Sequence, residues 1–238
     1  MKRASLLAAL LLLSFGGFAR SSQSEPAQED THPSVPTITF TLDWPGADPE
    51  HSVLEVESTG RASYSSSGSQ RFQLSDGYSL NFTISEGTRG RIFDLARSLN
   101  YFNRDFDYKR GKVAFTGKKT IAYADSSRHF VTSYNWSDNP SMRQLTELMQ
   151  AIGATLEFGR SLEYLHRHDR LGLNAELKRL DELAASDQLA ELQVLAPQLE
   201  QIAADSNVME IARQKARRLL QRVNARLAAA HPQRAAQR

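Results

Sequence analysis

The sequence predicts an α+β fold, in which an antiparallel sheet has helices packed on one face and is followed by an all-α helical bundle or hairpin. Two observations carry this prediction. Between residues 37 and 136, apolar and polar residues alternate in short runs that turn residues separate, as in half-buried strands. From residue 140 onward, apolar residues recur every three or four positions, as in amphipathic helices. We therefore expect the sheet to give way to helices near Asn139.

The first half of the chain holds the runs that are expected to form strands. Thr37–Leu42 alternates strictly, and Asp76-Gly77 is a strong turn dipeptide before another alternating run. One helix is expected to interrupt the strands, beginning at a cap residue, Ser85, and ending near Asn100. The expected strands are Thr37–Leu42, Val53–Glu57, Arg61–Tyr64, Arg71–Leu74, Tyr78–Ile84, Lys112–Thr116, Thr120–Ala124 and Arg128–Trp136.

The segment 139–169 is expected to join the two parts of the chain. Asn139 is suited to cap a helix, and Pro140 is suited to its first position. When residues are placed around the helix axis at about 100° each, the first apolar residues share one face and the later ones lie on roughly the opposite face. We therefore expect the first half of this helix to cover the sheet and the second half to begin the bundle. The first face holds Met142, Leu145, Met149, Ile152 and Leu156, and the second holds Phe158, Leu162 and Leu165.

The last third of the chain is expected to be helical, with three apolar stripes. Pro197 lies inside the second stripe and should kink or restart that helix, because proline removes a backbone donor. The first stripe is Leu173, Leu177, Leu180 and Leu183; the second is Leu189, Leu192, Leu195, Leu199 and Ile202; the third is Val208, Ile211, Ala212, Leu219, Val223 and Leu227.

The N-terminal residues of the chain indicate export. Residues 1–19 have a basic start, an apolar run and small residues before the expected cleavage point, as in a secretory signal peptide. A flexible linker is expected over 20–36, the α+β module over 37–156, the helical bundle over 157–228, and a disordered tail over 229–238. The chain has no cysteine, which removes thiol catalysis, cysteine–zinc sites and disulfides. We expect a periplasmic or secreted protein.

The α+β module resembles a small domain of secreted or envelope-associated bacterial proteins of unknown function. The resemblance rests on the hairpin Val53–Tyr64, the run Leu99-Asn100-Tyr101-Phe102 and the strand beginning Thr120-Ile121-Ala122-Tyr123. It implies no catalytic residues. Asp205–Leu220 is similar to the second helix of a HEAT-type repeat. That likeness implies protein–protein binding, although a solenoid needs about three repeats.

No cofactor is expected, because the chain has neither a phosphate-binding glycine loop nor a dinucleotide fingerprint. The nucleophile elbow of a serine hydrolase is also absent from the sequence. Asn103, Asp105 and Asp107 alternate like calcium ligands, but the glycine and closing glutamate of that loop are absent, so a solvated loop is the simpler interpretation. The run 166–169, His-Arg-His-Asp, could hold a metal only if the helix ended there. The simpler interpretation is a surface helix end, where histidine suits the helix dipole.

The basic last helix is the candidate interaction surface, with Arg213, Arg217, Arg218 and Arg222 as the predicted residues. Residues 207–238 carry eight Lys and Arg against one Glu, whereas residues 141–206 carry six basic and eleven acidic residues. Opposite charges in neighbouring helices are also what an internally neutralised bundle would have, so both interpretations stay open.

Together these features predict an exported, non-enzymatic protein that binds a protein or an envelope component. One alternative is peripheral binding to an anionic membrane or polymer through the last helix. A second is a hydrolase of unknown type. No nucleic acid partner is expected, because the chain is expected to leave the cytoplasm.

Overall fold

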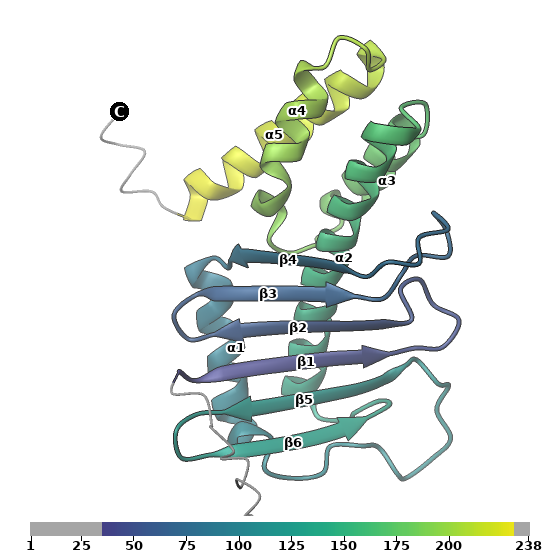
Figure 1. Cartoon of the computed structure of the whole chain (residues 1–238). Helices are drawn as coiled ribbons and strands as arrows, with labels where there is room; N and C mark the ends of the chain where they lie inside the picture. Colours follow the sequence, from purple (N-terminus) through teal and green to yellow (C-terminus); the bar gives the residue numbers. More distant parts are fainter. Residues whose placement is uncertain (1–34, 231–238) are drawn as a thin grey trace, which may run out of the picture. The chain divides into compact units, whose positions relative to one another are not determined.

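The computed structural model describes residues 35–230 and confirms the α+β fold, with a six-stranded antiparallel sheet followed by helices (Figure 1). The expected signal peptide, residues 20–34 of the expected linker and residues 231–238 of the expected tail lie outside the described residues. The strands are β1 (Thr37–Asp43), β2 (His51–Glu57), β3 (Arg61–Ser66), β4 (Tyr78–Thr83), β5 (Lys118–Ala124) and β6 (His129–Tyr134).

The strand order is β4-β3-β2-β1-β5-β6, and every neighbouring pair is antiparallel. β1 lies inside the sheet because it pairs with β2 on one side and β5 on the other. Ile38 of β1 is opposite Val56 and Tyr123, and all three are buried. The alternation of Thr37–Leu42 thus marks a central strand with one covered face.

Two expected strands are absent from the described residues. Arg71–Leu74 forms turns closed by a single bridge from Ser69 to Leu74, because the Arg71 amide donates to Asp48 and its side chain binds Glu176. Lys112–Thr116 is an exposed loop. The Thr116 amide donates to the side-chain oxygen of Asn135 and not to the backbone of a neighbouring strand. These two predictions were wrong because local side-chain bonds replaced the sheet ladder.

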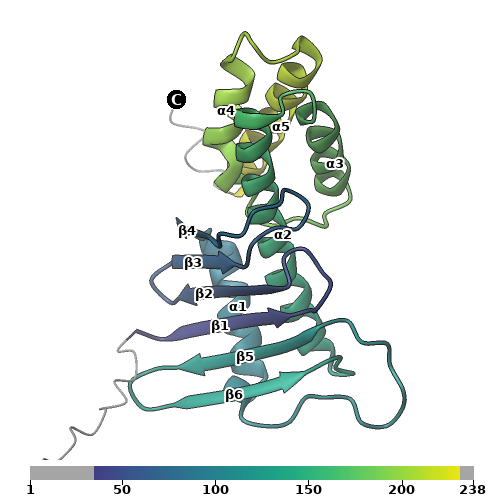
Figure 2. The ribbon, with the colours of Figure 1, turned by 45° about the vertical axis from the view of Figure 1, so that its right-hand side comes forward.

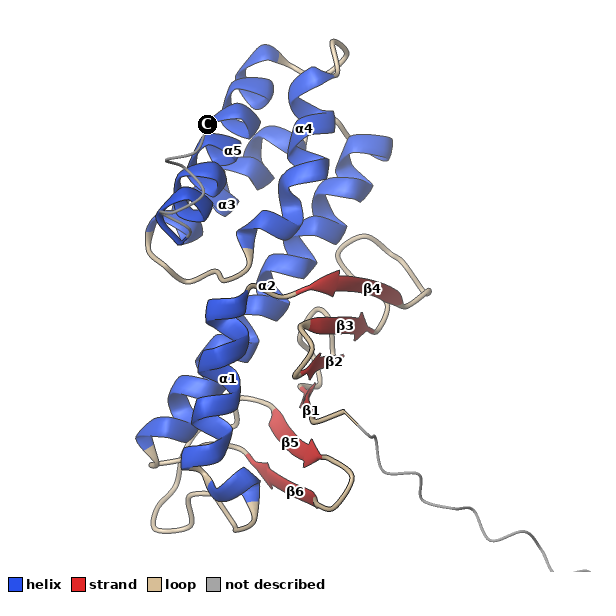
Figure 3. Ribbon diagram, turned by 90° about the vertical axis from the view of Figure 1, so that its left-hand side faces the viewer, coloured by secondary structure: helices blue, strands red, loops and turns tan. Residues whose placement is uncertain are grey.

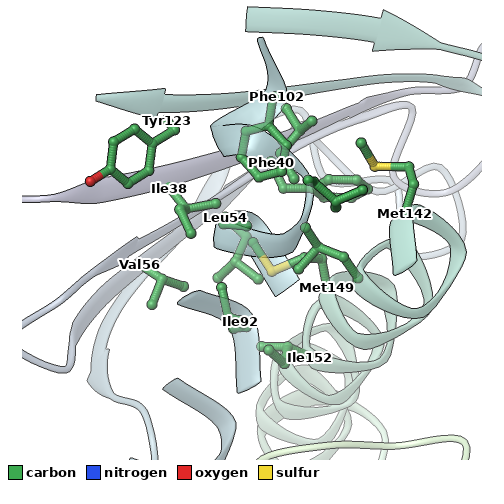
Figure 4. Close-up of a cluster of buried hydrophobic side chains, with 14 of the residues drawn as sticks. Ile38, Phe40, Leu54, Val56, Ile92, Phe102, Tyr123, Met142, Met149 and Ile152 are labelled. Atoms are coloured by element: carbon green, nitrogen blue, oxygen red, sulfur yellow. The ribbon is translucent and has the colours of Figure 1, made fainter. Parts of the chain in front are cut away.

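Both helices of the module lie on one face of the sheet (Figure 3). α1 (Glu86–Ser98) begins where expected, with the Ser85 hydroxyl accepting a hydrogen bond from the Thr88 amide. A short 3₁₀ turn, η1 (Asn100–Phe102), follows and buries Phe102. The side chains of the sheet, η1, α1 and the first half of α2 (Pro140–His168) meet in one core (Figure 4).

α2 has the two expected apolar faces. Met142, Met149 and Ile152 belong to the core under the sheet, whereas Leu162 and Leu165 belong to a second core among the later helices. The helix runs without a break through Gly159. A Cβ at Gly159 would lie 3.0 Å from Leu195 Cδ2, so this glycine permits close packing and hosts no kink.

The remaining helices are α3 (Leu173–Ala185), the 3₁₀ turn η2 (Leu192–Leu195), α4 (Ala196–Ala204) and α5 (Glu210–Ala230). Pro197 lies in the first turn of α4, so it restarts the chain as a new helix. Val208, Leu219 and Val223 are buried as predicted. Ile211 and Leu227 are exposed, contrary to prediction, because Ala212 and Ala216 occupy the packed face of α5.

Candidate functional site

One end of the sheet carries a surface that combines exposed cations with exposed apolar side chains. β1 ends at Asp43 and β5 begins at Lys118, and these two residues pair across the antiparallel ladder. The loop after β1 and the loop that leads into β5 therefore emerge together, at the right in Figures 1 and 2. Gly117 makes their contact possible, since its φ of +87° suits glycine and a Cβ there would lie 3.0 Å from Trp44 Cβ.

The loop into β5 is strongly basic. Residues 109–119, which we call the basic loop, contain five Lys and Arg residues and no carboxylate. Lys109 pairs with Asp105, and Arg110 pairs with Asp138, but the side chains in both pairs are exposed to water. Lys112 and Lys118 are exposed, and neither has a carboxylate partner within ion-pair distance among residues 35–230. Lys112 and Lys118 are therefore the two exposed cations of the basic loop that no carboxylate neutralises directly.

Apolar side chains project into water within the same surface. Phe115 is 58% exposed and Val113 is 41% exposed, and both lie in the basic loop. Trp44, the residue that contacts Gly117, is 39% exposed. Large apolar side chains that are exposed together in this way mark sites that contact other molecules.

Asn135, just beyond β6, holds the basic loop in place. Its side-chain oxygen accepts the Thr116 amide at 2.8 Å, and its side-chain nitrogen donates to the Ala114 carbonyl at 2.9 Å. Its own amide donates to Asp107 Oδ1 at 2.9 Å. These bonds fix the backbone on both sides of Phe115, so the exposed side chain is presented on a supported loop.

A cavity of about 290 Å³ lies behind the basic loop. Both tryptophans of the chain, Trp44 and Trp136, line it, together with Thr116 from the loop. Its wall also carries Arg143, whose guanidinium carbon lies 5.7 Å from the centre of the Trp136 ring. The cavity thus combines aromatic surface with a cation.

Lys119 is the buried cation of this cavity. Only 4% of the residue is exposed, and burial lowers the pKa of its amine. Its Nζ donates to the Thr116 carbonyl at 2.8 Å, the Thr116 hydroxyl at 2.7 Å and the Asn135 carbonyl at 2.7 Å. These oxygens satisfy the amine hydrogens without supplying a negative charge.

The predicted surface on α5 is arranged differently. Arg213 and Arg217 both pair with Glu210 of the same helix. Arg222 reaches Asp181 of α3, at 3.3 Å. Three of the four predicted arginines thus have acidic partners, and a further one, Arg226, pairs with Asp187 at 2.6 Å. Arg218 is exposed, without a carboxylate in ion-pair distance within the described part of the chain.

The other candidate ligands from the sequence have structural partners. Asp105 pairs with Lys109, and Asp107 accepts the Asn135 amide. His166 lies 2.9 Å from Asp205, and the His168 ring packs against Tyr164. Residues 35–230 contain no cluster of three or more side chains suited to hold a metal ion. None of the helices in that range has the length and apolar character needed to span a bilayer.

A second cavity, of about 380 Å³, is lined by the carboxylates that a hydrolase would need. Glu157 accepts bonds from the hydroxyls of Tyr64, at 2.9 Å, and Ser66, at 2.6 Å. Glu176 is bonded to Arg71, and Asp48 accepts from Ser69. The Glu157 and Glu176 bonds therefore join the module to α2 and α3.

A comparison with protein-family models and with curated proteins finds no significant match. The proposed function therefore rests on the sequence and the structure of this chain. The basic loop was not predicted, because the alternation of Lys112–Thr116 is typical of a strand. The signal that could have identified it is the run of five cations with no carboxylate around Val113 and Phe115.

Proposed function

We propose that this chain is an exported, non-enzymatic binding protein that attaches peripherally to an anionic bilayer through the basic loop and Trp44. The observation that carries the proposal is the exposure of Phe115 and Val113 within a stretch of five cations and no carboxylate. The expected signal peptide supports export, and an anionic bilayer is an envelope component of the kind that the sequence predicts.

The apolar side chains favour a bilayer over a soluble polyanion. A polyanion in water would engage the cations and leave Phe115 in water, whereas a bilayer offers both anionic headgroups and an apolar interior. Each cation near an anionic surface contributes about 1 kcal/mol. Burying the exposed half of Phe115 adds about 1–1.5 kcal/mol, half the value for a fully buried side chain. Lys112, Lys118 and Phe115, none of which has an ion pair to break, thus supply about 3 kcal/mol, which is reversible, peripheral binding.

The geometry favours the basic loop over α5 as the contact surface. The α5 arginines are engaged by Glu210 and by Asp181 within the protein. Moving them to a bilayer would require breaking those pairs, so their net contribution would be smaller. Lys112 and Lys118 have no such pair to break.

Two matched double variants separate the two surfaces. Lys112→Gln with Lys118→Gln removes two charges from the basic loop, and Arg217→Ala with Arg218→Ala removes two from α5. Binding is measured by co-sedimentation with phosphatidylcholine vesicles that contain one quarter phosphatidylglycerol, against pure phosphatidylcholine. We expect the loop variant to bind about 30-fold more weakly, since about 2 kcal/mol is lost. We expect the α5 variant to change little, and salt to weaken binding of the unaltered protein.

Two outcomes would contradict attachment to an anionic bilayer through the basic loop. Equal binding to neutral and anionic vesicles would remove the electrostatic argument. A large loss in the α5 variant, with none in the loop variant, would assign the contact to α5 instead. Phe115→Ser should weaken binding by a further five- to tenfold without altering its salt dependence.

A further inference from the structure

The cavity behind the basic loop opens onto the surface that we assign to the bilayer. Trp44 and Thr116 belong both to that surface and to the cavity wall. Phe115, the residue before Thr116 in the chain, is exposed, so contact of the basic loop with a bilayer would bring the cavity close to the lipid headgroups. Whatever occupies the cavity on the bilayer would therefore be a headgroup.

Two uncompensated cations face this space. Neither Lys119 nor Arg143 has a carboxylate within ion-pair distance in the part of the chain described here. Arg143 uses one guanidinium nitrogen to donate to the Asp138 carbonyl at 3.1 Å, which leaves most of its five donors for a ligand. The Lys119 amine donates all its hydrogens to protein oxygens, so it acts on a ligand through its charge. Together they favour an anionic group.

The hydrogen-bond acceptors of the cavity wall lie on one face of the helix α2. Arg143, Glu147 and Gln150 all line the cavity and are spaced by four and three residues. The Glu147 carboxylate would repel a dianion, but it can accept hydrogen bonds from hydroxyl groups, as can Gln150. The wall thus suits a singly charged phosphodiester that carries free hydroxyls, and it disfavours a phosphate monoester.

We infer that this cavity binds the headgroup of one anionic phospholipid, with the phosphodiester at Arg143 and Lys119 and its hydroxyls at Glu147 and Gln150. The inference rests on the proposed bilayer attachment. The volume of about 290 Å³ admits a glycerol-phosphate headgroup and leaves the acyl chains in the bilayer beside Phe115. Selectivity among anionic lipids then arises from the cavity, and general attraction to anionic surfaces arises from the basic loop.

The test compares phosphatidylglycerol with phosphatidylserine vesicles of equal anionic content, using Arg143→Gln and a variant of matched charge, Lys112→Gln. The unaltered protein should bind phosphatidylglycerol more tightly. Lys112→Gln should weaken binding to both lipids about fivefold and keep the preference. Arg143→Gln should abolish the preference through a loss of about tenfold on phosphatidylglycerol. Soluble glycerophosphoglycerol should shift the tryptophan fluorescence of the unaltered protein and not that of Arg143→Gln.

The outcomes distinguish this inference from the function on which it rests. If the unaltered protein binds no anionic vesicle, the proposed function fails. If it binds both lipids equally, or if Arg143→Gln keeps the preference, the headgroup site is overturned while bilayer attachment stands. If glycerophosphoglycerol alone binds and vesicles do not, the cavity takes a free phosphodiester and the lipid assignment is wrong. A folded state of each variant is verified by its circular dichroism spectrum.

Discussion

Replacing Arg71 by methionine should destabilise the protein far more than replacing an arginine in an exposed pair. Arg71 donates from Nη1 and Nη2 to the two carboxylate oxygens of Glu176, at 3.1 and 2.8 Å. The Glu176 side chain is only 4% exposed, whereas that of Arg71 is 45% exposed. Methionine keeps most of the apolar stem and removes both charge-assisted bonds, which leaves a buried carboxylate unpaired.

The magnitude follows from the unequal burial of the two partners. Breaking a fully buried pair costs about 3–5 kcal/mol, and exposed pairs contribute about 0–1 kcal/mol. Because water can reach the space that Arg71 leaves, we expect a loss of about 2–3 kcal/mol in the free energy of unfolding. Urea denaturation, followed by circular dichroism, measures it. The matched control is Arg61→Met, which breaks the solvent-screened pair with Glu57 and should cost much less than Arg71→Met.

A double variant completes the test. Combining Arg71→Met with Glu176→Leu removes the orphaned carboxylate, so it should recover most of the lost stability. Two results would contradict this expectation: Arg71→Met costs no more stability than Arg61→Met, or the double variant is less stable than Arg71→Met alone. Either result would mean that this pair does not hold the 67–77 loop to the helices.

Two further predictions concern the basic loop and the helical core. Gly117→Ala should lower the free energy of unfolding by about 1–2 kcal/mol and weaken vesicle binding, because alanine is strained at this φ and its Cβ would displace Trp44. If the variant is fully folded and binds vesicles as the unaltered protein does, the position of Trp44 does not matter for binding. Hydrogen bonds from Asn207 and His166 lower the pKa of Asp205 to about 2, below its value of about 3.9 in an unfolded chain. Its stabilising contribution should therefore be full above about pH 4 and be lost between about pH 4 and pH 2. A carboxyl titration followed by NMR measures this pKa, and Asp205→Asn should flatten the acid limb of the stability curve.

The long helix α2 shows what could be predicted from the sequence. Its cap, its proline and its two apolar faces are local properties, and they place Met149 and Leu162 in different cores. The central strand β1 was predictable for the same reason. Strict alternation between threonine and large apolar residues over Thr37–Leu42 requires one covered face and one open face.

The basic loop shows what local pattern cannot decide. Lys112-Val113-Ala114-Phe115-Thr116 alternates as a strand does, but a strand also needs a partner with free main-chain groups. The Asn135 side chain takes the Thr116 amide, so no ladder forms. Similarly, the charge asymmetry of the helices was visible in the sequence, but only the fold shows that Arg222 meets Asp181.

The cavity could not be predicted because Trp44 and Lys119 are distant in the sequence from the stretch 134–150 that forms most of its lining. Trp136 and Arg143 belong to that stretch, and the spacing of the whole set matches no ligand pattern. They meet because β1, β5 and β6 place their ends beside the start of α2. Only strand order and register determine that arrangement.

Tryptophan fluorescence tests the central claim most directly, because Trp44 lies at the proposed contact surface and Trp136, the other tryptophan of the chain, lines the cavity behind it. The protein is mixed with vesicles that contain phosphatidylglycerol and a lipid brominated in its acyl chains. We predict a blue shift and quenching with these anionic vesicles, reversal by salt, and loss of most quenching in Trp44→Phe. Emission that is unchanged by anionic vesicles, or quenched equally in neutral ones, would contradict attachment through the basic loop.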